Sequence, residues 1–193
     1  MHNSNNNIAE VCSDADHSHR DRLIIVGSGN VAHNVYRIAA ILGYSISVID
    51  SRAETLTRER FPEAGELLLG DIVELLNTCE INENTSIVLL SHHHEFDEVA
   101  LQAVIRSPAR YIGIMGNKHK VTAYFRQLHL WEIPEDLIKK VHVPIGLDLG
   151  GQRAAEIALS AMAEIQAVKY GRSGGFVVLQ REVKGRVERD ELF

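Results

Sequence analysis

The sequence has few cysteines, no excess of basic residues and no long apolar run. Its two cysteines, Cys12 and Cys79, are too few for a disulfide framework and form no C-x-x-C pair. Acidic residues (26) outnumber Lys and Arg (20), and the net charge of −6 does not favour nucleic acid. No segment approaches the roughly 18 apolar residues of a membrane span. The polar N-terminus also lacks the apolar core of a secretory signal. We therefore predict a cytoplasmic protein with neither a nucleic-acid nor a membrane partner.

The most informative segment is residues 23–32, where an apolar run is followed by the pattern G-x-G-x-x-A. This pattern is typical of the strand-turn-helix unit that binds dinucleotides. Gly27 is expected to make the tight turn, Gly29 to let a pyrophosphate approach the backbone, and Ala32 to let the helix lie close to the strand. The phosphates would lie at a helix N-terminus, which favours anions. The predicted contacts are Gly27, Ser28, Gly29, Asn30, Val31 and Ala32. The alternative is that the glycines only connect a strand to a helix.

A second predicted strand, residues 45–49, ends at Asp50. Asp50 follows the first glycine by the roughly 20 residues that separate the fingerprint from its ribose-binding acid. An acid at this position accepts hydrogen bonds from both ribose hydroxyls of NAD and repels the 2′-phosphate of NADP. Arg52, on the same side of an extended chain, would instead attract that phosphate or remain a plain surface charge. The cofactor is therefore NAD or NADP, and Asp50 favours NAD.

Predicted strands and helices alternate from residue 22 to about residue 170, which indicates an α/β fold. We predict a Rossmann-like, doubly wound, mostly parallel sheet with helices on both faces. Further strands are predicted at 66–69, 86–91 and 110–114, and helices at 31–42, 72–78, 96–105, 118–128, from 134, and at 154–170. Residues 1–20 are predicted to be a partly disordered polar leader, 21–175 the nucleotide-binding domain, and 176–193 a tail or an added strand.

Two further segments should lie at the carboxyl edge of this sheet, where open α/β sheets bind ligands. In residues 91–97, His92 and Asp97 are candidate acid–base residues and Ser91 a ligand contact. The alternative is that this segment caps the next helix and the other histidines are solvated. Three consecutive histidines point in different directions and give no H-x-x-x-H pair, so no metal site is predicted.

The other segment, residues 113–120, again places glycine between a strand and a helix. Met115, Gly116 and Lys120 are candidate contacts for a second anionic group. The alternative is a tight turn with solvated lysines.

Together these segments resemble the C-terminal Rossmann domain of the XdhC/CoxI family, the xanthine dehydrogenase accessory factors. The resemblance covers residues 22–170, and its most specific elements are Tyr-Ile-Gly-Ile-Met-Gly at 111–116 and Pro-Ile-Gly-Leu-Asp at 144–148. It implies a protein that binds molybdenum cofactor, assists its sulfuration and delivers it to a molybdenum hydroxylase apoenzyme. Typical members carry an additional N-terminal domain, and functions of that domain are not carried over to this chain.

The resemblance favours an accessory role over an enzymatic one, and it adds molybdopterin dinucleotide as a ligand for the same pocket, since this compound shares a pyrophosphate with NAD. Two other functions stay open. One is an NAD(P)-dependent oxidoreductase of a small substrate, using His92 and Asp97. The other is a regulatory protein that binds a partner through the helix at 154–170. A homodimer is also expected, as in many related open-sheet proteins.

Overall fold

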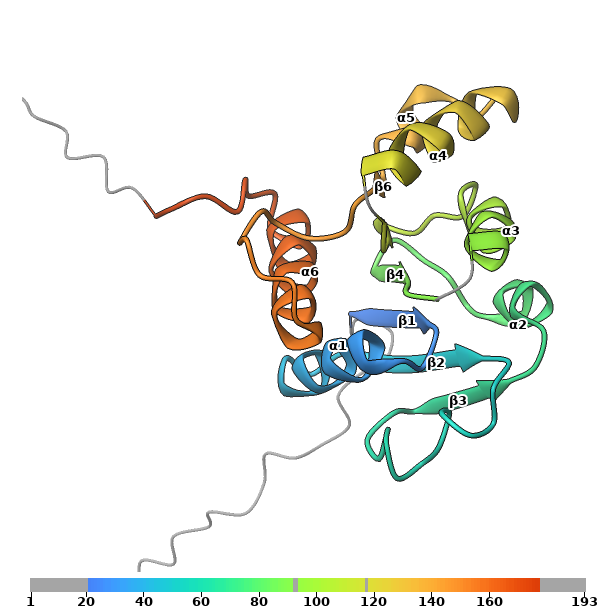
Figure 1. Cartoon of the computed structure of the whole chain (residues 1–193), viewed down its shortest axis with the longest axis vertical. Helices are drawn as coiled ribbons and strands as arrows, with labels where there is room; N and C mark the ends of the chain where they lie inside the picture. Colours follow the sequence, from blue (N-terminus) through green and yellow to red (C-terminus); the bar gives the residue numbers. More distant parts are fainter. Residues whose placement is uncertain (1–20, 92–93, 117, 178–193) are drawn as a thin grey trace, which may run out of the picture.

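Six parallel strands form one sheet in the computed structural model, which describes residues 21–91, 94–116 and 118–177 (Figure 1). The strands are β1 (Arg22–Val26), β2 (Ser45–Asp50), β3 (Glu66–Leu69), β4 (Thr85–Leu89), β5 (Tyr111–Ile114) and β6 (Val141–His142). Their order is β3-β2-β1-β4-β5-β6, and every neighbouring pair is parallel. This is the strand order of the doubly wound dinucleotide-binding fold, in which the order reverses between β1 and β4.

Helices cover both faces of the sheet, as predicted. They are α1 (Asn30–Ile41), α2 (Ile72–Thr78), α3 (His94–Val104), α4 (Lys118–Leu130), α5 (Glu135–Ile138) and α6 (Ala154–Lys169). Figure 1 shows α1 and α6 on one side of the sheet and α2 and α3 on the other. Within the described ranges, no helix has both the length and the apolar character that a membrane span needs.

The core has two layers because β1 is buried on both faces. Leu23 and Ile25 pack with residues of α1 and α6, whereas Ile24 and Val26 pack with residues of α2, α3 and α4. Alternate side chains of a strand point to opposite faces, so a continuous apolar run fits a strand that is covered on both sides. This burial fixes the end of β1, and with it the position of the glycine turn.

The structure also contains an element that the sequence pattern did not predict. β6 has only two residues, and it pairs with β5 through Val141 opposite Ile112 and His142 opposite Gly113. A two-residue strand is too short to show an alternating pattern. α3 begins at His94, two residues before its predicted start.

Candidate functional site

The turn after β1 has the geometry that the fingerprint requires. Gly27 has a φ of +108°, and a Cβ there would lie 2.9 Å from the carbonyl oxygen of Leu90. Its N–H donates to the carbonyl oxygen of Ile49 at 2.8 Å. Gly27 therefore sits where β1, β2 and β4 converge, and both its conformation and its surroundings exclude a side chain.

The N-terminus of α1 lies directly beyond this turn and has no side-chain cap. Gly29 is the N-cap residue, with φ −70° and ψ −173°, and among the residues that the structure describes no side chain accepts a hydrogen bond from the first N–H groups of the helix. By contrast, Asp71 accepts hydrogen bonds from the N–H groups of Val73 and Glu74 at the start of α2, both at 2.9 Å. The first N–H groups of a helix have no intrahelical partner. The start of α1 therefore offers free donors.

The remaining residues of the predicted loop divide into buried and accessible ones. Ser28 and Ala32 are fully buried, and Ala32 packs in the core between α1 and the sheet. Asn30 is exposed, and Gly29 and Val31 are partly exposed. The accessible surface of the loop therefore consists mainly of backbone and the side chains of Asn30 and Val31.

Asp50, at the end of β2, is held by protein groups on both of its carboxylate oxygens. Oδ2 accepts hydrogen bonds from the backbone N–H of Ser28 at 2.6 Å and its hydroxyl at 2.7 Å. Arg52 donates from Nη2 to Oδ2 at 2.9 Å, and from Nε and its backbone N–H to Oδ1 at 3.1 and 3.0 Å. The Ser28 hydroxyl also contacts the hydroxyl of Thr55 at 2.5 Å. The structure thus joins three predicted site residues, and it adds Thr55.

These contacts set the charge state of Asp50. Burial alone would raise the pKa of its carboxyl group, but the hydrogen bonds from Arg52 and Ser28 and the charge of Arg52 lower the pKa to about 2. The pKa of Arg52 is raised, chiefly by its hydrogen bonds to Asp50. Near neutral pH the pair is therefore a carboxylate joined to a guanidinium.

The segments after β4 and β5 lie at the same carboxyl edge of the sheet. The N–H of Leu90 donates to the carbonyl oxygen of Val26, and that of Met115 to the carbonyl oxygen of Leu89. Met115 and Gly116 are partly exposed there. Lys120 is in the first turn of α4, but its side chain is not among those described, and His92 lies outside the described residues.

Asp97 is buried in the same region. It is 1% exposed, and its carboxylate accepts hydrogen bonds from the Ser91 hydroxyl at 2.6 Å and from the Tyr124 hydroxyl at 3.5 Å. These contacts connect α3 to α4 and to the end of β4. The described residues contain no group of three or more metal-ligating side chains, so the structure adds no evidence for a metal.

The sequence pattern gave no indication of a polar cluster beside the loop that follows β6. Glu164 of α6 accepts hydrogen bonds from the Tyr111 hydroxyl and from the N–H of Gly146, the latter at 2.8 Å. The Nδ1 atom of His142 lies 3.1 Å from its other oxygen, and the His142 and Tyr111 rings stack at 4.4 Å. Burial would raise the pKa of Glu164, but the hydrogen bonds from His142 and Tyr111 lower it overall.

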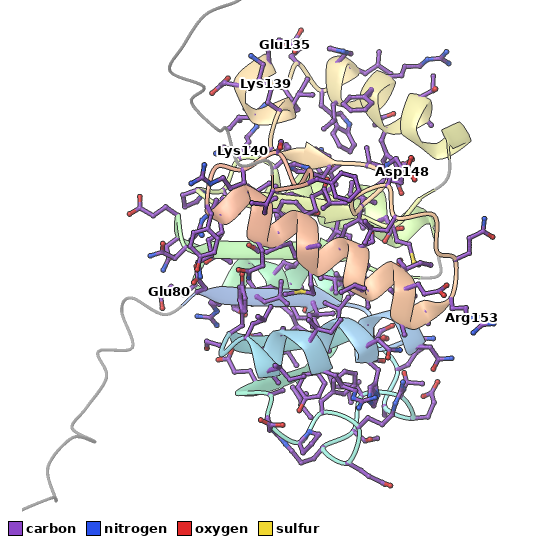
Figure 2. All side chains as sticks on the ribbon, turned by 90° about the vertical axis from the view of Figure 1, so that its left-hand side faces the viewer. Glu80, Glu135, Lys139, Lys140, Asp148 and Arg153 are labelled. Carbon is purple, nitrogen blue, oxygen red and sulfur yellow. The ribbon has the colours of Figure 1, made fainter. Side chains whose placement is uncertain are left out.

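This cluster holds the loop of residues 144–151, which lines a hollow of about 450 Å³. Figure 2 shows Asp148 and Arg153, in and just after this loop, at the opposite end of the molecule from Glu80 and Lys140. Since Glu80 precedes β4 and Lys140 precedes β6, the loop lies at the carboxyl edge. Tyr111, His142 and Glu164 come from β5, β6 and α6, and no local spacing in the sequence indicated that they meet.

The strand order, the glycine turn and the acid at the end of β2 define a Rossmann-like α/β domain. The chain belongs to the family of XdhC Rossmann domains, whose model matches residues 23–165.

Three relatives illustrate the similarity. The uncharacterized protein YqeB of Escherichia coli (strain K12) is 34% identical over 84% of this chain and 30% of its own length. A probable xanthine dehydrogenase subunit of Bacillus subtilis (strain 168) is 27% identical over 76% of this chain and 42% of its own. The molybdenum cofactor insertion chaperone PaoD of E. coli (strain K12) is 24% identical over 77% and 40%. The chain thus spans less than half the length of these relatives.

Among solved structures, the chain resembles a xanthine dehydrogenase from Bacillus halodurans. The two superpose with a TM-score of 0.69 at 27% sequence identity, over 80% of this chain and 44% of the other.

Proposed function

We propose that this chain is an accessory factor in the maturation of molybdenum hydroxylases and that it binds a dinucleotide at residues 27–32. The family membership and the similarity to a molybdenum cofactor insertion chaperone support the accessory role. Delivery of the cofactor to a hydroxylase apoenzyme is the step in which such a factor would act.

The observation that carries the ligand proposal is the uncapped start of α1 beside Gly29. The φ and ψ of Gly29 are those of ordinary extended backbone, which any residue adopts, so conformation does not require glycine at this position. Free N–H groups and the positive end of the helix dipole favour an anion at this point. A pyrophosphate fits this arrangement, whether it comes from NAD, NADP or molybdopterin dinucleotide.

The binding test is a calorimetric titration of the purified chain with NAD, NADP and molybdopterin dinucleotide. Gly29→Val is the blocking variant, because its branched side chain would occupy the approach to the helix N-terminus without a forbidden φ. We expect at least one dinucleotide to bind the native chain and to bind Gly29→Val at least tenfold more weakly, with little change in the thermal unfolding midpoint. Absence of binding by all three compounds would remove the ligand proposal.

The accessory role is tested separately, by deleting the gene and measuring the molybdenum content and activity of the cell's molybdenum hydroxylases. Loss of cofactor from intact apoenzyme supports the role, and unchanged cofactor content contradicts it. Steady substrate-dependent oxidation of NAD(P)H by the purified chain would indicate an oxidoreductase instead.

A further inference from the structure

We infer that Arg52 makes the end of β2 selective for a phosphate monoester, such as the 2′-phosphate of NADP, over an unsubstituted ribose. The inference rests on the proposed dinucleotide site and specifies its ligand class. It reverses the preference for NAD that Asp50 alone would predict.

The first argument is a count of acceptors on Asp50. A carboxylate has about four lone-pair positions, and ribose hydroxyls bind such an acid by donating to them. Ser28 supplies two donors and Arg52 three, all within 3.1 Å of the two oxygens. A ribose diol therefore finds no vacant acceptor on Asp50. It would have to displace Arg52 or Ser28 to bind.

The second argument concerns what the pair presents to solvent. The side chain of Asp50 is 5% exposed, whereas that of Arg52 is 34% exposed. Arg52 contacts Asp50 through Nε and Nη2, and a guanidinium has five N–H groups, so the Nη1 edge keeps donors for a ligand. The accessible part of the pair is thus a cationic donor, and the acceptor is covered.

A phosphate monoester matches such a donor because it offers several anionic oxygens to a guanidinium. The ion pair with Arg52 also compensates the negative charge of Asp50, which would otherwise repel the phosphate. Glu54 is the other acid whose charge acts on Arg52. Glu54 is exposed to solvent, so water and dissolved ions screen the repulsion between its carboxylate and a bound phosphate.

The experiment compares NADP with NAD on the native chain, Arg52→Ala, Arg52→Gln and the control Arg37→Ala. Arg37 is exposed on α1, so its replacement removes the same charge at a distance from Asp50. Arg52→Gln removes the charge but keeps an N–H donor near Asp50. It therefore provides a folded variant for the comparison if Arg52→Ala unfolds. Affinities are measured by calorimetry, and folding is checked by thermal unfolding.

We expect the native chain to bind NADP at least about tenfold more tightly than NAD. A gain in affinity of this size is what hydrogen bonds from one guanidinium to a phosphate contribute. Arg52→Ala is expected to lose that preference because the two affinities change in opposite directions. NADP should bind more weakly because its 2′-phosphate loses a donor, and NAD should bind more tightly because acceptors on Asp50 become free for its ribose. Arg52→Gln should lose the NADP preference too, and Arg37→Ala should retain it.

Two results would overturn the inference and leave the dinucleotide site intact. One is tighter binding of NAD than NADP by the native chain. The other is an equal change for both nucleotides in Arg52→Ala, as expected if Arg52 only supports the fold. Failure of all four proteins to bind either nucleotide would also overturn the inference, and the dinucleotide site would then depend on the titration with molybdopterin dinucleotide.

Discussion

The carboxylate of Glu164, on α6, accepts a hydrogen bond from the hydroxyl of Tyr111, the first residue of β5. The same oxygen accepts the N–H of Gly146, 18 residues away along the chain. One side chain thus ties a helix, a strand and the loop at 144–151 together. Because a buried polar group without a partner is costly, the Tyr111 hydroxyl and the Gly146 N–H both depend on Glu164.

Tyr111→Phe tests this dependence. The variant removes one donor but keeps the ring that stacks on His142. Glu164 then retains His142 and Gly146, so we expect a loss of about 1–2 kcal/mol in the free energy of unfolding, as for one buried hydrogen bond. Urea denaturation measures it. The control is Tyr170→Phe at an exposed position, where a change below about 0.5 kcal/mol is expected. Equal effects would mean that the Tyr111 hydroxyl contributes nothing to the cluster.

Gly27→Ala should destabilise the fold more than Gly43→Ala does. Both glycines have positive φ, +108° and +76°, so both variants strain the backbone. A Cβ at Gly27 would also press on the Leu90 carbonyl group, whereas one at Gly43 would meet nothing within 4 Å. We expect about 1 kcal/mol for Gly43→Ala and at least about 2–3 kcal/mol for Gly27→Ala. Comparable losses in urea denaturation would show that the turn can shift to accept a methyl group.

Asp50 is expected to make the fold sensitive to acid. Its pKa of about 2 in the folded protein is below the ordinary 3.8, so the folded state favours the charged form. The resulting stabilisation is fully present above about pH 4 and is lost as the pH falls towards 2. Asp50→Asn removes this contribution. It should therefore lower the free energy of unfolding by about 2 kcal/mol or more near pH 7, and by much less near pH 2–3. Urea denaturation across this range checks it, and a pH-independent loss would contradict it.

The sequence predicted the glycine turn well because its requirements are local. A strand, two glycines and a small residue lie within ten positions, and each has a steric reason. The sequence likewise placed Asp50 at the end of the second strand, where the structure has it, and its role in binding a ribose stays a prediction. The pairing of Asp50 with Ser28 was not predicted, because it depends on the alignment of β1 with β2, where Val26 lies opposite Ile49. The Glu164 cluster was missed for a similar reason, since it joins residues from β5, β6 and α6.

Gly113, inside β5, is explained by the loop that packs on it. A Cβ at this position would lie 2.6 Å from Cδ1 of Ile145 and 2.7 Å from Cε1 of Tyr111. The N–H of Ile145 donates to the carbonyl oxygen of Ile114, so the backbone of the loop lies directly beside the strand. Gly113→Ala should therefore push the loop outward, at a cost of about 1–3 kcal/mol in the free energy of unfolding.

A second substitution distinguishes crowding by Ile145 from a general cost of alanine in β5. Ile145→Ala removes Cδ1 and Cγ1, which would lie 2.6 and 2.8 Å from the new methyl group. If Ile145 causes the crowding, Gly113→Ala with Ile145→Ala should lose less stability than the sum of the two single variants, a coupling of about 0.5 kcal/mol or more. Additive losses in a double-mutant cycle would show that Ile145 moves aside freely. The loop at 144–151 would then be held by the Glu164 cluster rather than by close packing on β5.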